Sequence, residues 1–215
     1  MMVIIFCKPT LKTGTRLTRI TPYFRGMDFQ QDLELSLAAL KSGGIILYPT
    51  DTIWGIGCDA TNPEAVSRIY ALKQRQESKS MIVLAADQRD VLQYTAGVDL
   101  RVFDYLQGVT RPTTVVYEGG IGLAANLLAV DGSVGIRIVS EPFCKHLIKR
   151  LRVPVVSTSA NISGNPAPRF FDEIDPQIVQ GVDYVVHYRR EDRTLHEPSA
   201  VVKWGRDGQV QILRP

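Results

Sequence analysis

The chain has 215 residues, of which 45% are hydrophobic and 22% are charged, so it is long enough to bury one sizeable core. Its apolar runs are too short to span a bilayer, which excludes a membrane-inserted protein. The cysteines (Cys7, Cys58 and Cys144) and the histidines are too scattered for a disulfide framework or a zinc site, and this favours a reducing compartment, which we take to be the cytoplasm.

The formal net charge of +3 is concentrated in residues 1–26, which contain basic side chains and no acidic one. Such a segment suits a nucleic-acid-binding arm, because positive charge favours phosphate backbones, and it also has the Arg-containing, acid-free composition of a transit peptide. The interpretation that we prefer is a short extension upstream of a natural start at Met27. We therefore expect a basic extension over residues 1–26 and one domain over residues 27–215.

From residue 28 onward, the chain predicts helices that alternate with strands. Apolar residues at helical spacing predict a first helix that begins at Asp28 and stops at Gly43 and Gly44. A strand follows over residues 45–48, and Asn62 as N-cap with Pro63 at the first helical position predicts a helix over residues 62–73. A strand over residues 81–85 and helices over residues 87–96 and 98–107 complete the first half.

The second half contains more strands than helices. Strands are predicted over residues 113–118, 133–139, 153–161, 184–187, 199–204 and 209–214, and helices over residues 141–152 and 171–180. No linker or repeat interrupts the chain after residue 26. The order of elements predicts an α/β (α+β) fold in which a twisted mixed β-sheet is flanked by helices in a single domain.

Cations gather where the second helix ends and the next strand begins. Lys73, Arg75 and Lys79 lie within seven residues in "LKQRQESKSMIVLAA". A solvated turn would explain them, but a triphosphate needs several cations, with Lys as a point charge and Arg as a bidentate fork. Ligands in open sheets bind where loops leave the strand ends, so we expect this cluster to face one cleft together with "PTDTIWGIGCD" and "STSANISGNPAP".

The segment "STSANISGNPAP" is rich in hydrogen-bonding side chains directly after a Val-Val strand. These are Ser157, Thr158, Ser159, Asn161 and Ser163. Helix capping and turn formation would use such residues, yet their density exceeds what is needed to end a strand. Hydroxyl and amide groups can hold phosphate oxygens or a carboxylate without adding net charge, so this loop would complement the cations.

Other kinds of chemistry find no support. The sequence has no G-x-x-x-x-G-K-[ST] phosphate loop, no dinucleotide-binding glycine fingerprint and no G-x-S-x-G nucleophile. Cys58 follows a glycine-rich turn, where a reactive thiol is conceivable, but a small buried residue is the more common case. The remaining site consists of cations and hydroxyls, which favours a reaction at phosphorus driven by positioning and charge neutralisation.

Several segments resemble the YrdC/Sua5/TsaC family of threonylcarbamoyl-AMP synthases. They are "GGIILYPTDTIWGIGCDA", "LKQRQESKSMIVLAAD", "SVGIRIV", "VVSTSANISG" and the terminal "PSAVV…ILRP", and they extend from about residue 30 to residue 215. The specific part is a K-x-R motif followed by an S-x-N motif in this order. The chain resembles the short, single-domain form of the family, without the extra C-terminal domain of the longer form.

The resemblance implies a three-substrate reaction. L-Threonine and bicarbonate (or CO2) would give a carbamate, which would attack the α-phosphate of ATP, and Mg2+ would reach the site with ATP and not through protein side chains. The product, threonylcarbamoyl-AMP, would pass to a tRNA threonylcarbamoyl transferase complex that modifies tRNA adenosine. Direct binding of tRNA or another RNA is conceivable, and a membrane partner is not expected.

The resemblance also implies roles for single residues. The catalytic set would be Lys73, Arg75, Ser159 and Asn161. ATP would be bound by Lys73, Lys79, Thr114, Ser159, Asn161 and Arg214. Threonine would be bound by Thr52, Arg75 and Ser157, and Arg137 and Ser199 would lie in the same cleft.

Departures from the family pattern leave a second function open. The usual W-P-G-P-x-T segment is reduced to Pro112, Thr113 and Thr114, a Ser-Thr pair is replaced by Ser199 and Ala200, and Trp54 stands where tyrosine is common. These changes bear on the threonine pocket. The alternative is therefore a YciO-type paralogue that binds a nucleotide or RNA with little synthase activity, and we prefer the synthase.

Overall fold

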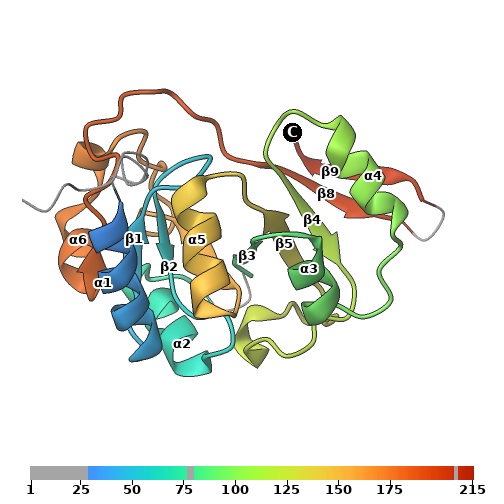
Figure 1. The fold of residues 1–215 in the computed structure, drawn as a ribbon, viewed down its shortest axis with the longest axis horizontal. Helices are drawn as coiled ribbons and strands as arrows, with labels where there is room; N and C mark the ends of the chain where they lie inside the picture. The colour runs from blue at the N-terminus through green and yellow to red at the C-terminus, as the bar shows by residue number, and fades with distance from the viewer. Residues whose placement is uncertain (1–28, 77–79, 206–207) are drawn as a thin grey trace, which may run out of the picture.

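A computed structural model describes residues 29–76, 80–205 and 208–215. Within these ranges, nine strands form one sheet in the order β7-β1-β2-β6-β3-β5-β4-β8-β9 (Figure 1). The pairs β1/β7, β3/β5 and β4/β8 are parallel and the other neighbours are antiparallel, so the predicted mixed sheet is confirmed. The strands are β1 (Ile46–Tyr48), β2 (Gly55–Gly57), β3 (Ile82–Ala85), β4 (Thr113–Tyr117), β5 (Val134–Ile138), β6 (Val155–Ser159), β7 (Tyr184–Val185), β8 (Ala200–Trp204) and β9 (Val210–Arg214).

The helices of the described residues begin and end close to where the sequence predicts. They are α1 (Gln30–Lys41), α2 (Pro63–Leu72), α3 (Gln88–Tyr94), α4 (Arg101–Gly108), α5 (Pro142–Leu151) and α6 (Pro176–Gly181), with short 3-10 turns η2 (Ala125–Leu127) and η3 (Phe171–Glu173). The Asn62 side chain accepts a hydrogen bond from the Ala65 N–H, as an N-cap does. In the part of the chain that is described, no helix combines the length and apolar character needed to cross a membrane.

Two expectations about the elements are wrong. The loop "PTDTIWGIGCD" contains β2, which pairs with β1 and β6. The strand was not predicted because Gly55 and Gly57 break the usual pattern of strand-forming residues. Glycine is required at position 57, since a Cβ atom there would lie 2.4 Å from the Val156 carbonyl oxygen. The single helix expected over residues 171–180 is divided into η3 and α6, because Asp175 caps a new helix that starts at Pro176.

The first helix also begins differently. Its N-cap position is Phe29, without a side-chain cap, and Asp28 lies outside the described residues, as does the whole 1–26 extension. Phe29 instead packs edge-on against Phe143 of α5, with ring centroids 5.7 Å apart. This contact joins α1 to α5, which lie beside each other in front of the sheet in Figure 1.

The two faces of the sheet differ in chemistry. Side chains alternate along a strand, so Val115 and Ile136 point toward the helices, where they are buried in the core. Thr114 and Arg137, their neighbours in β4 and β5, point to the opposite face. That face is polar in the middle of the sheet, and it is where a ligand can meet several strands at once.

Candidate functional site

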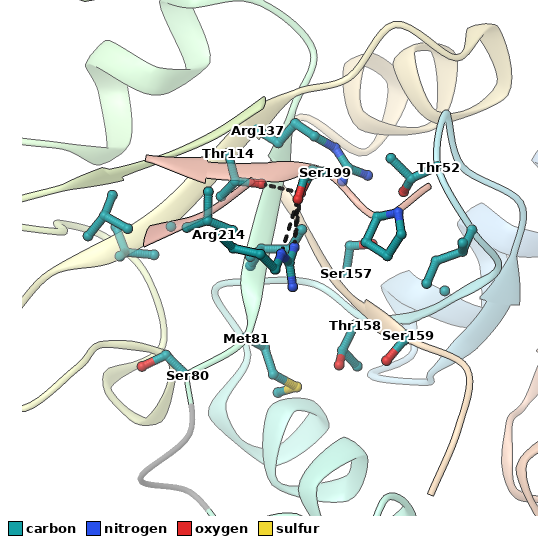
Figure 2. Close-up of a pocket in the computed structure, with 18 of the residues that line it drawn as sticks. Thr52, Ser80, Met81, Thr114, Arg137, Ser157, Thr158, Ser159, Ser199 and Arg214 are labelled. Carbon is teal, nitrogen blue, oxygen red and sulfur yellow. Dashed lines mark hydrogen bonds between the residues drawn. The ribbon is translucent and has the colours of Figure 1, made fainter. Parts of the chain in front are cut away.

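A cleft of about 500 Å³ lies on the polar face of the sheet (Figure 2). Strand ends and strand centres that are far apart in sequence supply its walls. The predicted site residues among them are Thr52, Arg75, Thr114, Arg137, Ser157, Ser159, Ser199 and Arg214. Each of the three polar segments contributes to this one cleft, but of the predicted cation cluster only Arg75 lines it.

The wall formed by β4, β8 and β9 is held by hydrogen bonds around Ser199. The Thr114 and Ser199 hydroxyls lie 2.9 Å apart and are both buried. Arg214 donates from Nη2 to the Ser199 carbonyl oxygen at 2.8 Å, so its guanidinium is fixed beside the two hydroxyls (Figure 2). This wall presents a cation and hydroxyls with little freedom to move, as phosphate binding requires.

Arg137 reaches the cleft from β5 and is almost completely buried. Its Nη2 lies 3.0 Å from Asp51 Oδ1, and the two side chains are 2% and 7% exposed. Among the described residues, Arg137 Nε has no hydrogen-bond partner. A buried guanidinium N–H without a partner costs free energy, which an anionic ligand in the cleft would recover.

Lys73 is placed differently from the sequence prediction. Its side chain is buried, and Nζ donates to the carbonyl oxygens of Ser159 at 2.5 Å and Asn161 at 2.6 Å. It does not line the cleft. Burial, together with the charge of Arg75, lowers the pKa of Lys73 to about 8. In this structure Lys73 therefore holds the loop after β6 in place through two hydrogen bonds. Its role in binding a triphosphate stays a prediction.

The Asn161 side chain also stabilises the loop after β6. Its side-chain Nδ2 donates to the carbonyl oxygens of Ile162 and Asn165, at 3.0 and 2.6 Å, and Asn161 does not line the cleft either. Ser159, two residues earlier in the S-x-N motif, does line it. β6 ends at Ser159 and the chain bends at residues 160 and 161, so Asn161 no longer follows the side-chain alternation of the strand and the two halves of the motif are separated.

Arg75 lines the cleft, although it lies only two residues after Lys73. Its Nη2 donates to the Ser80 carbonyl oxygen at 2.9 Å, which joins the end of the second helix to the start of β3. Lys79, the third cation of the predicted cluster, lies outside the described residues.

Two of the three predicted threonine-binding residues, Thr52 and Ser157, lie at the β1–β2 end of the cleft. Thr52 is buried, and its hydroxyl lies 2.9 Å from the Thr50 hydroxyl, which itself donates to the Ile53 carbonyl oxygen. Ser157 is buried in β6 across from this loop. Small hydroxyls around a pocket of this kind suit a short polar ligand, and the assignment to threonine stays a prediction.

Sequence reasoning missed several lining residues. Trp54, which the sequence marks only as a departure from the family pattern, lines the cleft and packs at a tilt against Phe171, with ring centroids 4.9 Å apart. Ser80 and Ser133 also line the cleft, and Ser133 is hidden in a turn where its hydroxyl donates to Asp131 at 2.6 Å. The density of polar residues marks the S-x-N loop, but isolated serines in turns carry no such signal.

The charge of the cleft has one sign. Its lining includes Arg75, Arg137 and Arg214 and no described carboxylate. Burial and the nearby charges of Arg137 and Arg111 lower the pKa of Arg214. Because like charges face each other here, an anion with several charges would stabilise the whole arrangement.

Comparison with known proteins identifies the family. The family model for Sua5, YciO and YrdC proteins, described as "Telomere recombination", matches residues 38–215. The chain belongs to this family. A Stenotrophomonas maltophilia protein named threonylcarbamoyl-AMP synthase is 32% identical over 157 residues, covering 72% of this chain and 84% of that protein. A Vibrio campbellii protein of the same name is 30% identical over 188 residues, covering 86% of this chain and 98% of that protein.

Solved structures agree on the fold. P. abyssi Sua5 complexed with L-threonine superimposes with a TM-score of 0.75 at 19% identity, covering 86% of this chain and 54% of that chain. The present chain thus spans about half the length of that Sua5 chain. E. coli YciO superimposes with a TM-score of 0.71 at 22% identity, covering 86% of this chain and 89% of that chain. At these identities the likeness shows the fold alone.

The structure also locates the departures from the family pattern. Val201 lines the cleft, so its predecessor Ala200 points to the opposite face of the sheet. The missing hydroxyl at Ala200 therefore leaves the cleft unchanged, contrary to the sequence expectation. Pro112 and Thr113 do not line it either, whereas Thr114 does.

Proposed function

We propose that this protein is a threonylcarbamoyl-AMP synthase that consumes L-threonine, bicarbonate or CO2, and ATP. The observation that carries the proposal is the cleft itself, in which arginines and hydroxyls converge without a carboxylate. Relatives that bear this enzyme name match over most of the chain. A positively charged cleft of this size suits a nucleoside triphosphate together with a small amino acid.

The reaction balances without a covalent enzyme intermediate. The threonine amine adds to CO2 and loses a proton, which gives a carbamate. A carbamate oxygen then attacks the α-phosphorus of ATP, the bond to the bridging oxygen breaks, and pyrophosphate leaves. With bicarbonate as the carbon source, one water is also released. The developing charge lies on phosphate oxygens, so fixed cations stabilise it.

Arg75 and Arg214 would hold the phosphates, with the Thr114 and Ser199 hydroxyls and Ser159 as neutral donors. Arg137, with its unpartnered Nε, would face a carboxylate or phosphate at the centre of the cleft. Thr52, Ser157 and Arg75 would position threonine. The triphosphate roles of Lys73, Lys79 and Asn161 rest on the family resemblance.

Magnesium would enter as part of the substrate, Mg·ATP. The described residues contain no group of three or more His, Cys, Asp or Glu side chains that could hold a metal ion. The cleft offers hydroxyls and cations, so phosphate oxygens and water would supply the metal ligands, as Mg2+ commonly prefers. The product would be used in the cytoplasm by a separate transferase that modifies tRNA adenosine.

The test is a reconstitution with purified protein, Mg·ATP, threonine and bicarbonate, in which pyrophosphate release and the mass of threonylcarbamoyl-AMP are followed. Each substrate is omitted in turn. Product that requires both threonine and bicarbonate is the expected result. A protein that binds ATP but forms no product would instead be a YciO-type binding protein, whose RNA affinity would then be measured as a function of salt, with and without residues 1–26.

A further inference from the structure

A second cavity of about 640 Å³ lies on the helix side of the same sheet. It opens beyond the carboxyl ends of the parallel strands β3 and β5, where ligands often bind in α/β sheets. Its walls come from the start of α3, from α4 and α5, and from residues 109–113. We call it the helix-side cavity. Its size is in the range of small-molecule sites.

Its charged groups leave an excess of positive charge. Arg89, Arg111 and Lys145 line it, against the carboxylates Asp51 and Asp87. Only Asp51 is neutralised by a buried cation, and Asp87 keeps most of its charge. Asp51 Oδ1 pairs with Arg137, while Asp87 Oδ1 accepts the Arg89 N–H at 2.9 Å as the N-cap of α3, and Asp87 Oδ2 lies 4.0 Å from Lys149 Nζ outside the cavity.

The three cations of the cavity have few charged partners. In the described ranges, neither Arg89 nor Lys145 has a carboxylate within ion-pair distance. Arg111 lies 3.0 Å from Glu197, but that carboxylate is 78% exposed, and a pair of this kind contributes little. Three cations against one remaining carboxylate, Asp87, leave an excess of two positive charges for an anion that enters the cavity.

The remaining wall is apolar. Phe103 and Leu106 of α4, with Ile138 at the end of β5, form one side, and Ser140 and Thr110 add hydroxyls. An apolar wall beside a cationic rim matches a molecule that has a charged group at one end and an apolar or aromatic body.

Asp51 connects this cavity to the cleft. It lines the helix-side cavity, whereas its ion-pair partner Arg137 lines the cleft. Asp51 Oδ2 accepts hydrogen bonds from the Ser140 N–H at 3.0 Å and the Ser140 hydroxyl at 3.2 Å, and Ser140 faces the helix-side cavity. One buried carboxylate thus forms the wall between the two sites.

We propose that the helix-side cavity binds a small phosphorylated molecule. Arg89 and Lys145 hold its phosphate, Phe103 and Leu106 contact its apolar body, and its occupancy reaches the cleft through Ser140, Asp51 and Arg137. A phosphate is favoured over a carboxylate because its two negative charges match the excess of two positive charges in the lining. The inference does not depend on the reaction catalysed in the cleft.

The test uses 15N-labelled full-length protein at low ionic strength, titrated with phenyl phosphate, with benzoate as a singly charged probe and phenol as a neutral one. Amide signals of Thr110, Arg111 and Ser140 report on the helix-side cavity. The Nε–Hε signal of Arg137 reports on the shared wall. The variant is Arg89→Gln with Lys145→Gln, and the matched control is Lys41→Gln, an exposed cation at the end of α1.

We expect saturable shifts of all four signals with phenyl phosphate, at least about tenfold weaker binding of benzoate, and no binding of phenol. The double variant should lose phenyl phosphate affinity by at least about tenfold, and Lys41→Gln should keep it. Absence of saturable shifts at Ser140 and Thr110 would overturn the site. Phenyl phosphate bound in the cleft would shift the Arg137 signal in both proteins, so the connection through Asp51 is measured as the part of the Arg137 shift that the double variant loses, and no loss would overturn it.

Discussion

Lys73 and Arg75 are two residues apart in sequence, but they belong to different environments. Lys73 is buried under the loop that follows β6, where it holds two carbonyl oxygens, while Arg75 lines the cleft and is bonded to the backbone at the start of β3. A positive charge thus stabilises the backbone of the site at Lys73, whereas at Arg75 it faces the cleft where a ligand would bind. A cation motif in a sequence gives the charge of a site, and burial decides what each charge does.

The strongest test of this comparison is the replacement of the cation that faces the ligand. We expect Arg75→Ala to lower kcat/KM by about 100-fold, because a fixed cation at a developing phosphate charge is lost. The melting temperature should stay within a few degrees of the parent value, since Arg75 is only partly buried. Steady-state pyrophosphate release and thermal unfolding measure the two quantities.

Arg75→Lys serves as the control, since it keeps the charge without the guanidinium fork, and it should recover part of the activity. An alanine variant as active as the parent would exclude Arg75 from the phosphate site. A variant that is inactive because it unfolds would place Arg75 with Lys73 as a structural cation.

The second test replaces the buried cation. Lys73→Met removes the donor to the half-buried Ser159 and Asn161 carbonyl oxygens, so we expect the free energy of unfolding to fall by about 2 kcal/mol. Activity should fall by at least about tenfold, because the S-x-N loop is no longer held in place. Urea unfolding and turnover are measured on the same preparation, with the exposed Lys41→Met as the matched control.

The comparison fails if Lys73→Met keeps the parent stability and loses ATP affinity. That result would mean that Lys73 leaves its two carbonyl partners in solution and binds the triphosphate directly, as the family resemblance implies.

The titration of Lys73 gives a smaller effect with a defined sign. Its pKa in the folded protein is about 8, below the usual 10.5, so between these values the unfolded chain binds more protons than the folded one. Stability should therefore rise with pH above about pH 8, with a slope of up to about 1.4 kcal/mol per pH unit from this group. Below pH 8 both states are protonated and the contribution is flat.

The measurement is the difference in unfolding free energy between the parent and Lys73→Met from pH 7 to pH 10. Staying below pH 10 matters, because burial raises the pKa of Tyr48 and Tyr117, whose titration would destabilise the fold at higher pH. A difference that does not change with pH would show that the two carbonyl oxygens keep Lys73 protonated throughout this range.

Most of the fold follows from local sequence signals. Asn62 and Pro63 mark the start of α2 because capping depends on neighbours in the chain. The strand β2 was missed, since its glycines are needed for contacts with β1 and β6 that only the folded sheet creates. Local sequence patterns therefore predict local structure, but they do not show where two strands will approach closely.

The site was predictable to a different extent. Charge and polarity marked Arg75, Ser157 and Ser159 directly, and the structure brings them together. Thr114, Ser199 and Arg214 followed only from the family resemblance, because nothing in their local sequence links strands β4, β8 and β9. The burial of Lys73 depends on where the end of β6 lies, and this is a property of the sheet order.

The same reasoning about faces predicts where a change should have little effect. Ala200→Thr restores the hydroxyl that the family usually has, but position 200 points away from the cleft, toward Thr113 on the helix side. We expect KM for threonine to change by less than about twofold, and stability by less than about 1 kcal/mol, because a half-buried strand position accepts a β-branched residue. Ser199→Ala, one residue earlier and facing the cleft, is the matched comparison and should weaken ATP binding. A clear gain in threonine affinity from Ala200→Thr would mean that residue 200 faces the cleft in the working enzyme. The division of the sheet into a ligand face and a helix face would then have to be revised at β8.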